Sequence, residues 1–217
     1  MSDPEYHLVA TGTRVADVAP LVDRLRSLSD QDVTFTVDIW LQTDSHAIPR
    51  YRFPPDVSLN HELRIPAEHV AAFVDVLDPL ITDPNRRWPE LGVPDSEGGR
   101  WLSVHGAELE TLPALPPVPV EIEVWELPAA AFDPATIPTE ADHPVCASIE
   151  WSAFWPAVPD KGLRPHGKHA AVCLVVNGTN PWDLAPDVPG YRLYLVTEWG
   201  GDRRAAHLAA AAGLRLE

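Results

Sequence analysis

Alternation of apolar and polar residues predicts most of the secondary structure as β-strands. Residues 32–41 (DVTFTVDIWL) place Val33, Phe35, Val37 and Ile39 on one face of a strand. Residues 118–127 (VPVEIEVWEL) repeat the pattern, with Glu121, Glu123 and Trp125 opposite the aliphatic side chains. The remaining strands are predicted over 5–10, 57–65, 100–104, 145–155, 169–176 and 191–199. Residues 169–176 are the most apolar, so we expect this strand near the centre of a sheet.

Apolar residues spaced three and four apart predict three helices. The first falls within residues 13–28, with Thr13 as a possible N-cap or Pro20 as its first residue. The second begins at Pro66. The third is rich in alanine, runs to Leu214 and is predicted to be capped by Asp202.

The predicted strands outnumber the helices that could connect them. This ratio favours an α+β fold with largely antiparallel sheets and flanking helices. Residues 82–117 are rich in proline and glycine, which is typical of a connector. We therefore predict two similar-sized lobes, residues 1–81 and 118–217, either separate or packed as one globule.

Charge narrows the range of partners. The chain has 32 acidic residues against 16 Lys and Arg, a formal net charge of −16, and no Lys or Arg between Trp101 and Asp160. This balance disfavours binding to nucleic-acid phosphates and to anionic membranes. A basic protein or a cationic ligand is the expected partner, although acidity can also serve solubility alone.

Several features of the chain predict a cytoplasmic protein. The start, MSDPE, lacks the features of a signal peptide, and no apolar run is long enough to cross a membrane. Cys146 and Cys173 lie in apolar segments, where we expect buried free thiols. The Arg-rich, Lys-poor and Ala/Pro-rich composition suggests a bacterial genome of high GC content.

One group of residues has a spacing near that of a zinc site: His143-x2-Cys146-x19-His166-x2-His169. Cys146 is predicted to point inward from a strand, and Gly167 to turn the chain between the two following histidines. We therefore expect a loop with solvent-facing histidines, and neither a metal nor another cofactor.

Catalytic motifs give little support for an enzyme. The phosphate-binding motif GxxxxGK[ST], the dinucleotide motif GxGxxG, the GxSxG elbow and the HExxH zinc motif are all absent. These absences remove the common enzyme classes without excluding every enzyme, and we leave that question open.

Acidic and aromatic residues in the second half provide a candidate interface. We predict partner contacts from Glu121, Glu123, Glu126, Trp125, Trp151 and Trp155, although tryptophans at such positions also often close a core. The expected function is a non-catalytic acidic binding or inhibitor protein, comparable to an immunity protein, that docks a basic protein. The alternative is a small enzyme or ligand-binding protein with a pocket between the lobes, using His143, His166 or His169 with nearby carboxylates.

Overall fold

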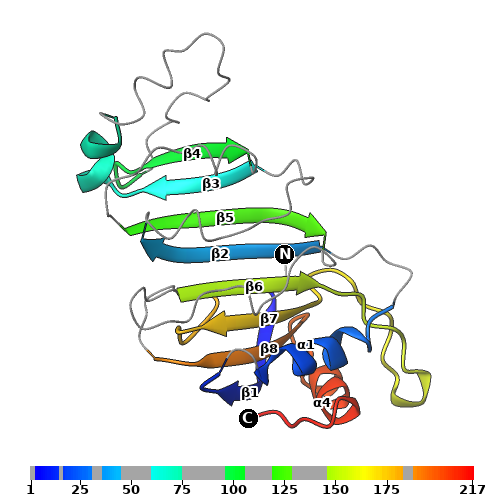
Figure 1. Ribbon diagram of the computed structural model, residues 1–217. Helices are drawn as coiled ribbons and strands as arrows, with labels where there is room; N and C mark the ends of the chain where they lie inside the picture. Colours follow the sequence, from blue (N-terminus) through cyan, green and yellow to red (C-terminus); the bar gives the residue numbers. More distant parts are fainter. Residues whose placement is uncertain are drawn as a thin grey trace.

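The computed structural model describes residues 3–14, 17–30, 36–44, 60–74, 96–105, 119–128, 146–182 and 188–217. Eight strands form one sheet, and all neighbouring strands run antiparallel (Figure 1). They are β1 (Glu5–Gly12), β2 (Thr36–Asp44), β3 (Asn60–Ile65), β4 (Arg100–His105), β5 (Pro119–Pro128), β6 (Cys146–Ser152), β7 (Ala171–Val176) and β8 (Tyr191–Thr197). The predicted α+β class with antiparallel pairing is therefore confirmed.

The order of strands across the sheet is β1-β8-β7-β6-β2-β5-β3-β4. Strands from the two predicted lobes are intermixed in this order. β2 lies between β5 and β6, and β1 pairs with β8. The sheet therefore does not divide at the predicted connector, residues 82–117, which itself contributes β4.

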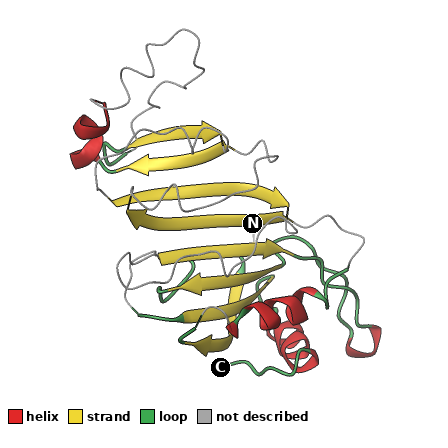
Figure 2. Ribbon diagram, viewed as in Figure 1, coloured by secondary structure: helices red, strands yellow, loops and turns green. Residues whose placement is uncertain are grey.

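Two α-helices, α1 (Ala19–Arg26) and α4 (Asp202–Ala211), lie together near the end of the sheet formed by β1, β8 and β7 (Figures 1 and 2). Pro20 lies in the first turn of α1, as predicted, but the N-cap is Val18 rather than Thr13. The N-cap of α4 is Gly201, so Asp202 is the first helical residue and not the cap. A 3-10 turn at Ala67–His69 with Pro66 at its N-cap leads into helical residues 70–74, where the second helix is predicted, and another 3-10 turn occupies Pro159–Lys161. Within the described part of the chain, no helix has the length and apolar character needed to cross a membrane.

α1 and α4 cover one face of the sheet at the end formed by β1, β8 and β7 (Figure 1). Val22 and Leu25 of α1 and Leu208 of α4 belong to the same buried cluster as Ile149 and Leu193 of the sheet. β7 is buried along its whole length on both faces, as expected for a strand in the interior of the sheet.

The opposite face is polar across the neighbouring strands β6, β2 and β5. It carries Asp38 on β2, Glu121 and Glu123 on β5, and Glu150 on β6, because these residues alternate with buried aliphatic ones. We call this surface the acidic face. The predicted division of residues 120–125 between the two faces is confirmed, while residue 118 lies outside the described residues.

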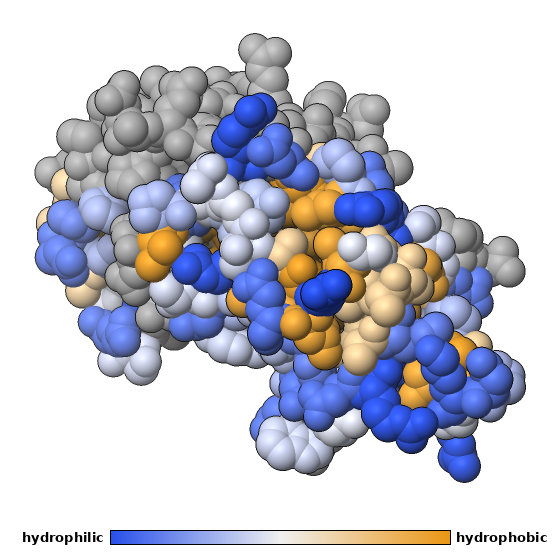
Figure 3. Space-filling view, turned by 90° about the horizontal axis from the view of Figure 1, so that it is seen from below, coloured by the Kyte–Doolittle hydropathy of each residue, from blue (hydrophilic) through white to orange (hydrophobic). Residues whose placement is uncertain are grey.

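The chain ends beside β1. The backbone N–H of Glu217 donates to the carbonyl of Leu8 at 3.0 Å, and Leu214 and Leu216 pack against the core. Figure 3 views this end of the molecule from below and shows an apolar area bordered by hydrophilic side chains.

Gly190 closes the loop that leads into β8. Its N–H donates to Oδ1 of Asn177 at 3.0 Å, and its carbonyl accepts the N–H of Asn177 at 2.8 Å. Its φ of 109° belongs to the left-handed region, and a Cβ at this position would collide with the carbonyl oxygen of Gly12. The position therefore requires glycine on two counts.

We predict that Gly190→Ala lowers the free energy of unfolding by about 3 kcal/mol, because strain and a backbone collision add. Gly162 has a φ of 67° with open space around it, so Gly162→Ala is the matched control and should cost only about 1 kcal/mol. Urea denaturation measures both values. Equal losses would show that the close approach to Gly12 has no energetic weight.

Candidate functional site

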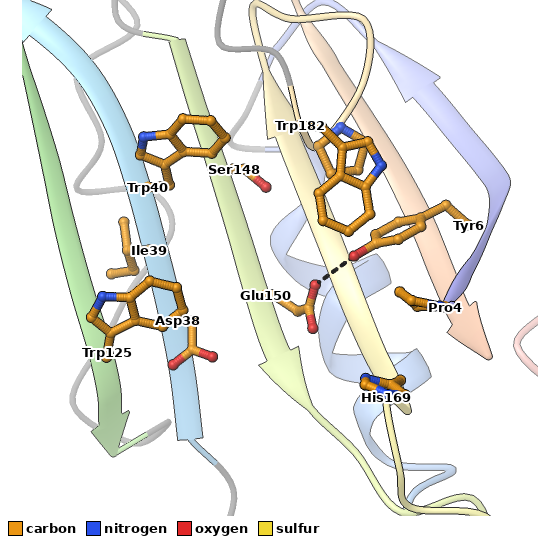
Figure 4. A pocket seen from close by; sticks show the side chains of 11 residues that line it. Pro4, Tyr6, Asp38, Ile39, Trp40, Trp125, Ser148, Glu150, His169 and Trp182 are labelled. Carbon is orange, nitrogen blue, oxygen red and sulfur yellow. Dashed lines mark hydrogen bonds between the residues drawn. The ribbon is translucent and has the colours of Figure 1, made fainter. Parts of the chain in front are cut away.

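A cavity of about 260 Å³ lies on the acidic face where β6 and β2 are neighbours (Figure 4). We call it the sheet pocket. Its walls come from β1, β2, β5, β6 and the segments that flank β7. The lining residues are Pro4, Tyr6, Asp38, Ile39, Trp40, Trp125, Ser148, Glu150, His169, Pro181 and Trp182.

Two carboxylates face each other across the floor of the sheet pocket. Asp38 and Glu150 are directly opposite in the β2–β6 register. Asp38 Oδ1 accepts the N–H of Glu126 at 2.8 Å, and Glu150 Oε2 accepts the hydroxyl of Tyr6 at 3.1 Å. Burial raises the pKa of both carboxyl groups, and the charge of Asp38 raises that of Glu150 further. The fold therefore holds two like charges together and partly out of water.

A β-bulge brings Trp125 into the wall. The register between β2 and β5 shifts between Val37 and Ile39, so Trp125 and Glu126 together lie opposite Asp38. Glu126 has a φ of 58°, the left-handed conformation that such bulges use. Trp125 remains 54% exposed at the edge of the pocket.

Trp182 forms the facing wall together with Tyr6. Their rings meet edge to face, with centroids 4.9 Å apart, as Figure 4 shows. The hydroxyl of Tyr194 donates to the carbonyl of Thr179 at 2.9 Å, which holds the loop that carries Trp182 on this face. The backbone N–H of Trp182 also donates to Asn180 Oδ1 at 2.9 Å. These hydrogen bonds fix the position of Trp182, although its side chain is 61% exposed.

The predicted acidic residues lie on β5 in three different environments. Glu121 pairs with Arg64, Oε1 to Nη1 at 3.3 Å, and Arg64 also pairs with Glu97. Glu123 is half-buried and Glu126 is exposed. Part of the predicted acidic patch is therefore neutralised within the protein itself.

The predicted tryptophans also differ in their exposure to solvent. Trp125 lines the sheet pocket, whereas Trp151 and Trp155 are 1% and 0% exposed. Both belong to the core on the side of the helices, and Trp155 Nε1 donates to the carbonyl of Val196 at 3.2 Å. They have no surface to offer a partner, so the alternative that such tryptophans close the core applies to them.

The residues of the possible zinc site do not converge. Cys146 begins β6, whereas His169 precedes β7 at the other end, where Ser152 pairs with Ala171. The length of β6, about 20 Å at the usual rise per residue, separates them. His143 lies outside the described residues. Both cysteines are free and buried, as predicted, and burial raises the pKa of the Cys173 thiol.

His166 and His169 have different surroundings. His169 is exposed, with a φ of 58°, at the rim of the sheet pocket. His166 is half-buried, and its Nε2 lies 3.2 Å from Oε2 of Glu198, whose other oxygen is 3.5 Å from Nε of Arg204. Burial lowers the pKa of His166. The expectation of two solvent-facing histidines therefore holds for His169 only.

A second group of potential metal ligands anchors α4. Glu5, His7 and Asp202 each offer an atom within 4.8 Å of the others. Glu5 Oε2, however, accepts the N–H groups of Gly200 and Gly201 at 3.0 and 3.3 Å, and His7 Nε2 is 2.9 Å from Thr197 Oγ1. These contacts satisfy the start of α4, which is sufficient reason for the cluster.

The lining of the sheet pocket combines hydroxyl groups, carboxylates and aromatic rings. Ser148 and Tyr6 supply its hydroxyl groups: that of Ser148 lies 3.7 Å from the thiol of Cys173, and that of Tyr6 donates to Glu150 at 3.1 Å. Among the described lining residues, the tyrosine hydroxyl is bonded to a carboxylate, whereas the serine hydroxyl has no histidine or carboxylate partner. Aromatic rings and carboxylates are both groups that attract cations.

Sequence reasoning missed most of this pocket. Asp38 and Trp40 fall on the polar positions of the alternating segment 32–41, and Glu150 on a polar position of β6. Those positions indicate a shared polar face, but not which strands become neighbours. No family model, no curated protein and no solved structure matches the chain.

We predict that Asp38→Asn and Glu150→Gln each stabilise the protein at about pH 7, by about 1 kcal/mol. Both carboxyl groups have a raised pKa in the fold, so the fold favours their protonated forms and loses stability as the pH rises through those values. Their ordinary values are 3.8 and 4.5, so the gain should shrink as the pH falls toward that range. Urea denaturation across this pH range is the measurement.

Asp160→Asn, at an exposed carboxylate outside the sheet pocket, is the control and should change stability little. Destabilisation by Glu150→Gln at about pH 7 would contradict the argument, because the amide keeps an oxygen that can accept the Tyr6 hydroxyl.

Proposed function

We propose that the protein is a non-catalytic acidic binding protein that docks a basic protein partner on its acidic face, in the manner of an immunity protein or another inhibitor. The observation that carries this proposal is the sheet pocket, in which Asp38 and Glu150 lie opposite each other. Neither carboxylate forms an ion pair with a cationic side chain among the described residues. Two like charges held opposite each other destabilise a sheet, and a cation supplied by a partner relieves that cost.

The surroundings of the sheet pocket support a protein partner. Trp125 and Trp182 are both more than half exposed, although large aromatic side chains are usually buried. Exposed tryptophans beside a recess are typical of the anchor residues of interfaces. The net charge of −16 supports attraction of a basic surface and opposes binding to nucleic acid. We place this function in the cytoplasm, in keeping with two free cysteines.

Glu123 and Glu126 extend the acidic face beyond the pocket. Both lie on β5 beside Trp125, and Glu126 is exposed. Glu121 contributes less net charge because Arg64 neutralises it. The proposed interface therefore contains Trp125, Trp182, Glu123 and Glu126 around the carboxylates of the pocket, and it omits Trp151 and Trp155.

A second candidate function is the binding or conversion of a small ligand. The recess itself and the presence of His169 beside Asp38 and Glu150 favour it. This differs from the predicted pocket between two lobes, since the site lies within one continuous sheet. Of the three histidines proposed for such a site, His169 is the one found at the pocket among the described residues.

The docking function is tested by isolating the tagged chain from its native host and rebuilding the complex from purified components. We expect one basic protein in stoichiometric amount, bound more weakly as the salt concentration rises. Recovery of the chain without a stoichiometric basic partner would contradict the proposal.

We predict that neutralising Glu123 and Glu126 together to glutamine slows association with that partner by roughly threefold to tenfold at low ionic strength. The dissociation rate should change less, because charges at the rim act mainly on the encounter of the two proteins. Surface plasmon resonance at low and high salt measures both rates.

The matched control is Asp23→Asn with Asp160→Asn, which removes the same net charge from exposed positions outside the acidic face. Equal slowing by the two double variants would mean that total charge, and not this face, directs association.

A further inference from the structure

The carboxylates of the sheet pocket each keep one oxygen available. Asp38 uses Oδ1 to accept the N–H of Glu126, and Glu150 uses Oε2 to accept the Tyr6 hydroxyl. The other two oxygens, Oδ2 and Oε1, accept no hydrogen bond from any residue that the structure describes. Glu121 and Glu198 differ, since each lies within 4.0 Å of an arginine nitrogen. The pocket therefore presents two carboxylate oxygens that can accept hydrogen bonds from a positively charged donor.

Aromatic rings surround these acceptors. Trp40 projects from β2, Trp125 from the bulge of β5, and Trp182 and Tyr6 close the other side (Figure 4). The negative faces of such rings attract a cation, most strongly those of tryptophan. Aromatic walls also favour cations that are weakly hydrated, because a cation must lose much of its water to enter.

Among organic cations, the guanidinium group fits both features. It is planar, weakly hydrated and stacks on aromatic rings, and it carries five N–H donors for carboxylate oxygens. A quaternary ammonium has no N–H to donate, so it would leave both acceptors unsatisfied. A primary ammonium is compact and strongly hydrated, so it loses more on entering an aromatic recess.

The size of the recess suits one side chain. Pockets for drug-sized ligands enclose roughly 300–1,000 Å³. The sheet pocket, at about 260 Å³, is smaller than that range and opens on the face proposed for docking. Exposed Trp125 and Trp182 at its edge can cover the aliphatic stem of an inserted side chain.

We propose that the sheet pocket receives the guanidinium group of an arginine side chain from the basic partner. Asp38 Oδ2 and Glu150 Oε1 accept its N–H groups, and the rings of Trp40, Trp125 and Trp182 enclose it. This inference rests on the proposed docking function for the source of the arginine, but the recognition of guanidinium can be tested without any partner.

The test is a titration of the intact chain with N-acetyl-arginine methylamide, followed by the indole N–H signals in NMR spectra. Saturable shifts are expected for Trp40, Trp125 and Trp182, while the exposed Trp199 and the buried Trp155 serve as internal references. N-acetyl-lysine methylamide and tetramethylammonium should each bind at least tenfold more weakly. Stronger or equal binding of either one would overturn the guanidinium assignment.

Variants at the pocket identify the residues that bind. Glu150→Gln and Trp182→Ala should each weaken binding of the arginine derivative at least tenfold. Asp160→Asn and Trp199→Ala, which alter exposed residues outside the pocket, should leave it unchanged. Because Glu150→Gln is expected to stabilise the fold, lost binding together with unchanged or raised stability reports the site and not misfolding. Equal binding by Glu150→Gln would contradict the proposed acceptor role.

Two outcomes separate this inference from the docking function. If a basic partner docks with the same affinity to Glu150→Gln and to the unaltered chain, the pocket inference fails while the docking function stands. If free arginine binds tenfold more tightly than its blocked derivative, the guanidinium comes from a small molecule, and the assignment to a partner side chain is overturned.

Discussion

The pairing of β2 with β6 is the constraint on which the candidate site depends. It joins residues more than a hundred positions apart in the chain and places Asp38 directly opposite Glu150. The same register aligns Trp40 with Ser148 and, on the other face, Ile39 with Ile149. A shift by one residue would exchange the two faces of β2 and bury Asp38 among aliphatic side chains. Burial of the aliphatic face thus also determines which groups line the sheet pocket.

The two parts of the acidic face differ in how their charge is balanced. Near β3, Arg64 lies between Glu97 and Glu121, so that part is an internal ion-pair network. At the sheet pocket, the hydrogen bonds from Tyr6 and from the backbone of Glu126 support the carboxylates without supplying a positive charge. If stability alone were selected, these two positions would hold neutral side chains or carboxylates paired with a cationic side chain. The remaining electrostatic cost is the one that the proposed partner would relieve.

Local patterns were sufficient to predict much of the fold, because strand alternation depends on neighbours in the sequence. The faces of β5, the burial of β7 and the free cysteines follow from such patterns. The position of β2 between β5 and β6 does not, since strand order is decided by contacts between distant segments. The proline-rich composition of residues 82–117 suggested a boundary between lobes, yet β4 within it extends the sheet. Composition describes local conformation and says little about topology.

The candidate site shows the same limit. Trp125, Trp151 and Trp155 are all predicted as contact residues from the sequence. Trp125 lies at the surface, whereas Trp151 and Trp155 are buried. The difference lies in what covers each face of β6 and the segment after it, which no local pattern encodes. Trp182 is exposed on a loop that Tyr194 holds at the carbonyl of Thr179. An aromatic residue therefore becomes part of a site when the fold supplies both a charged neighbour and an uncovered face, and here both conditions are met at the junction of β2 and β6.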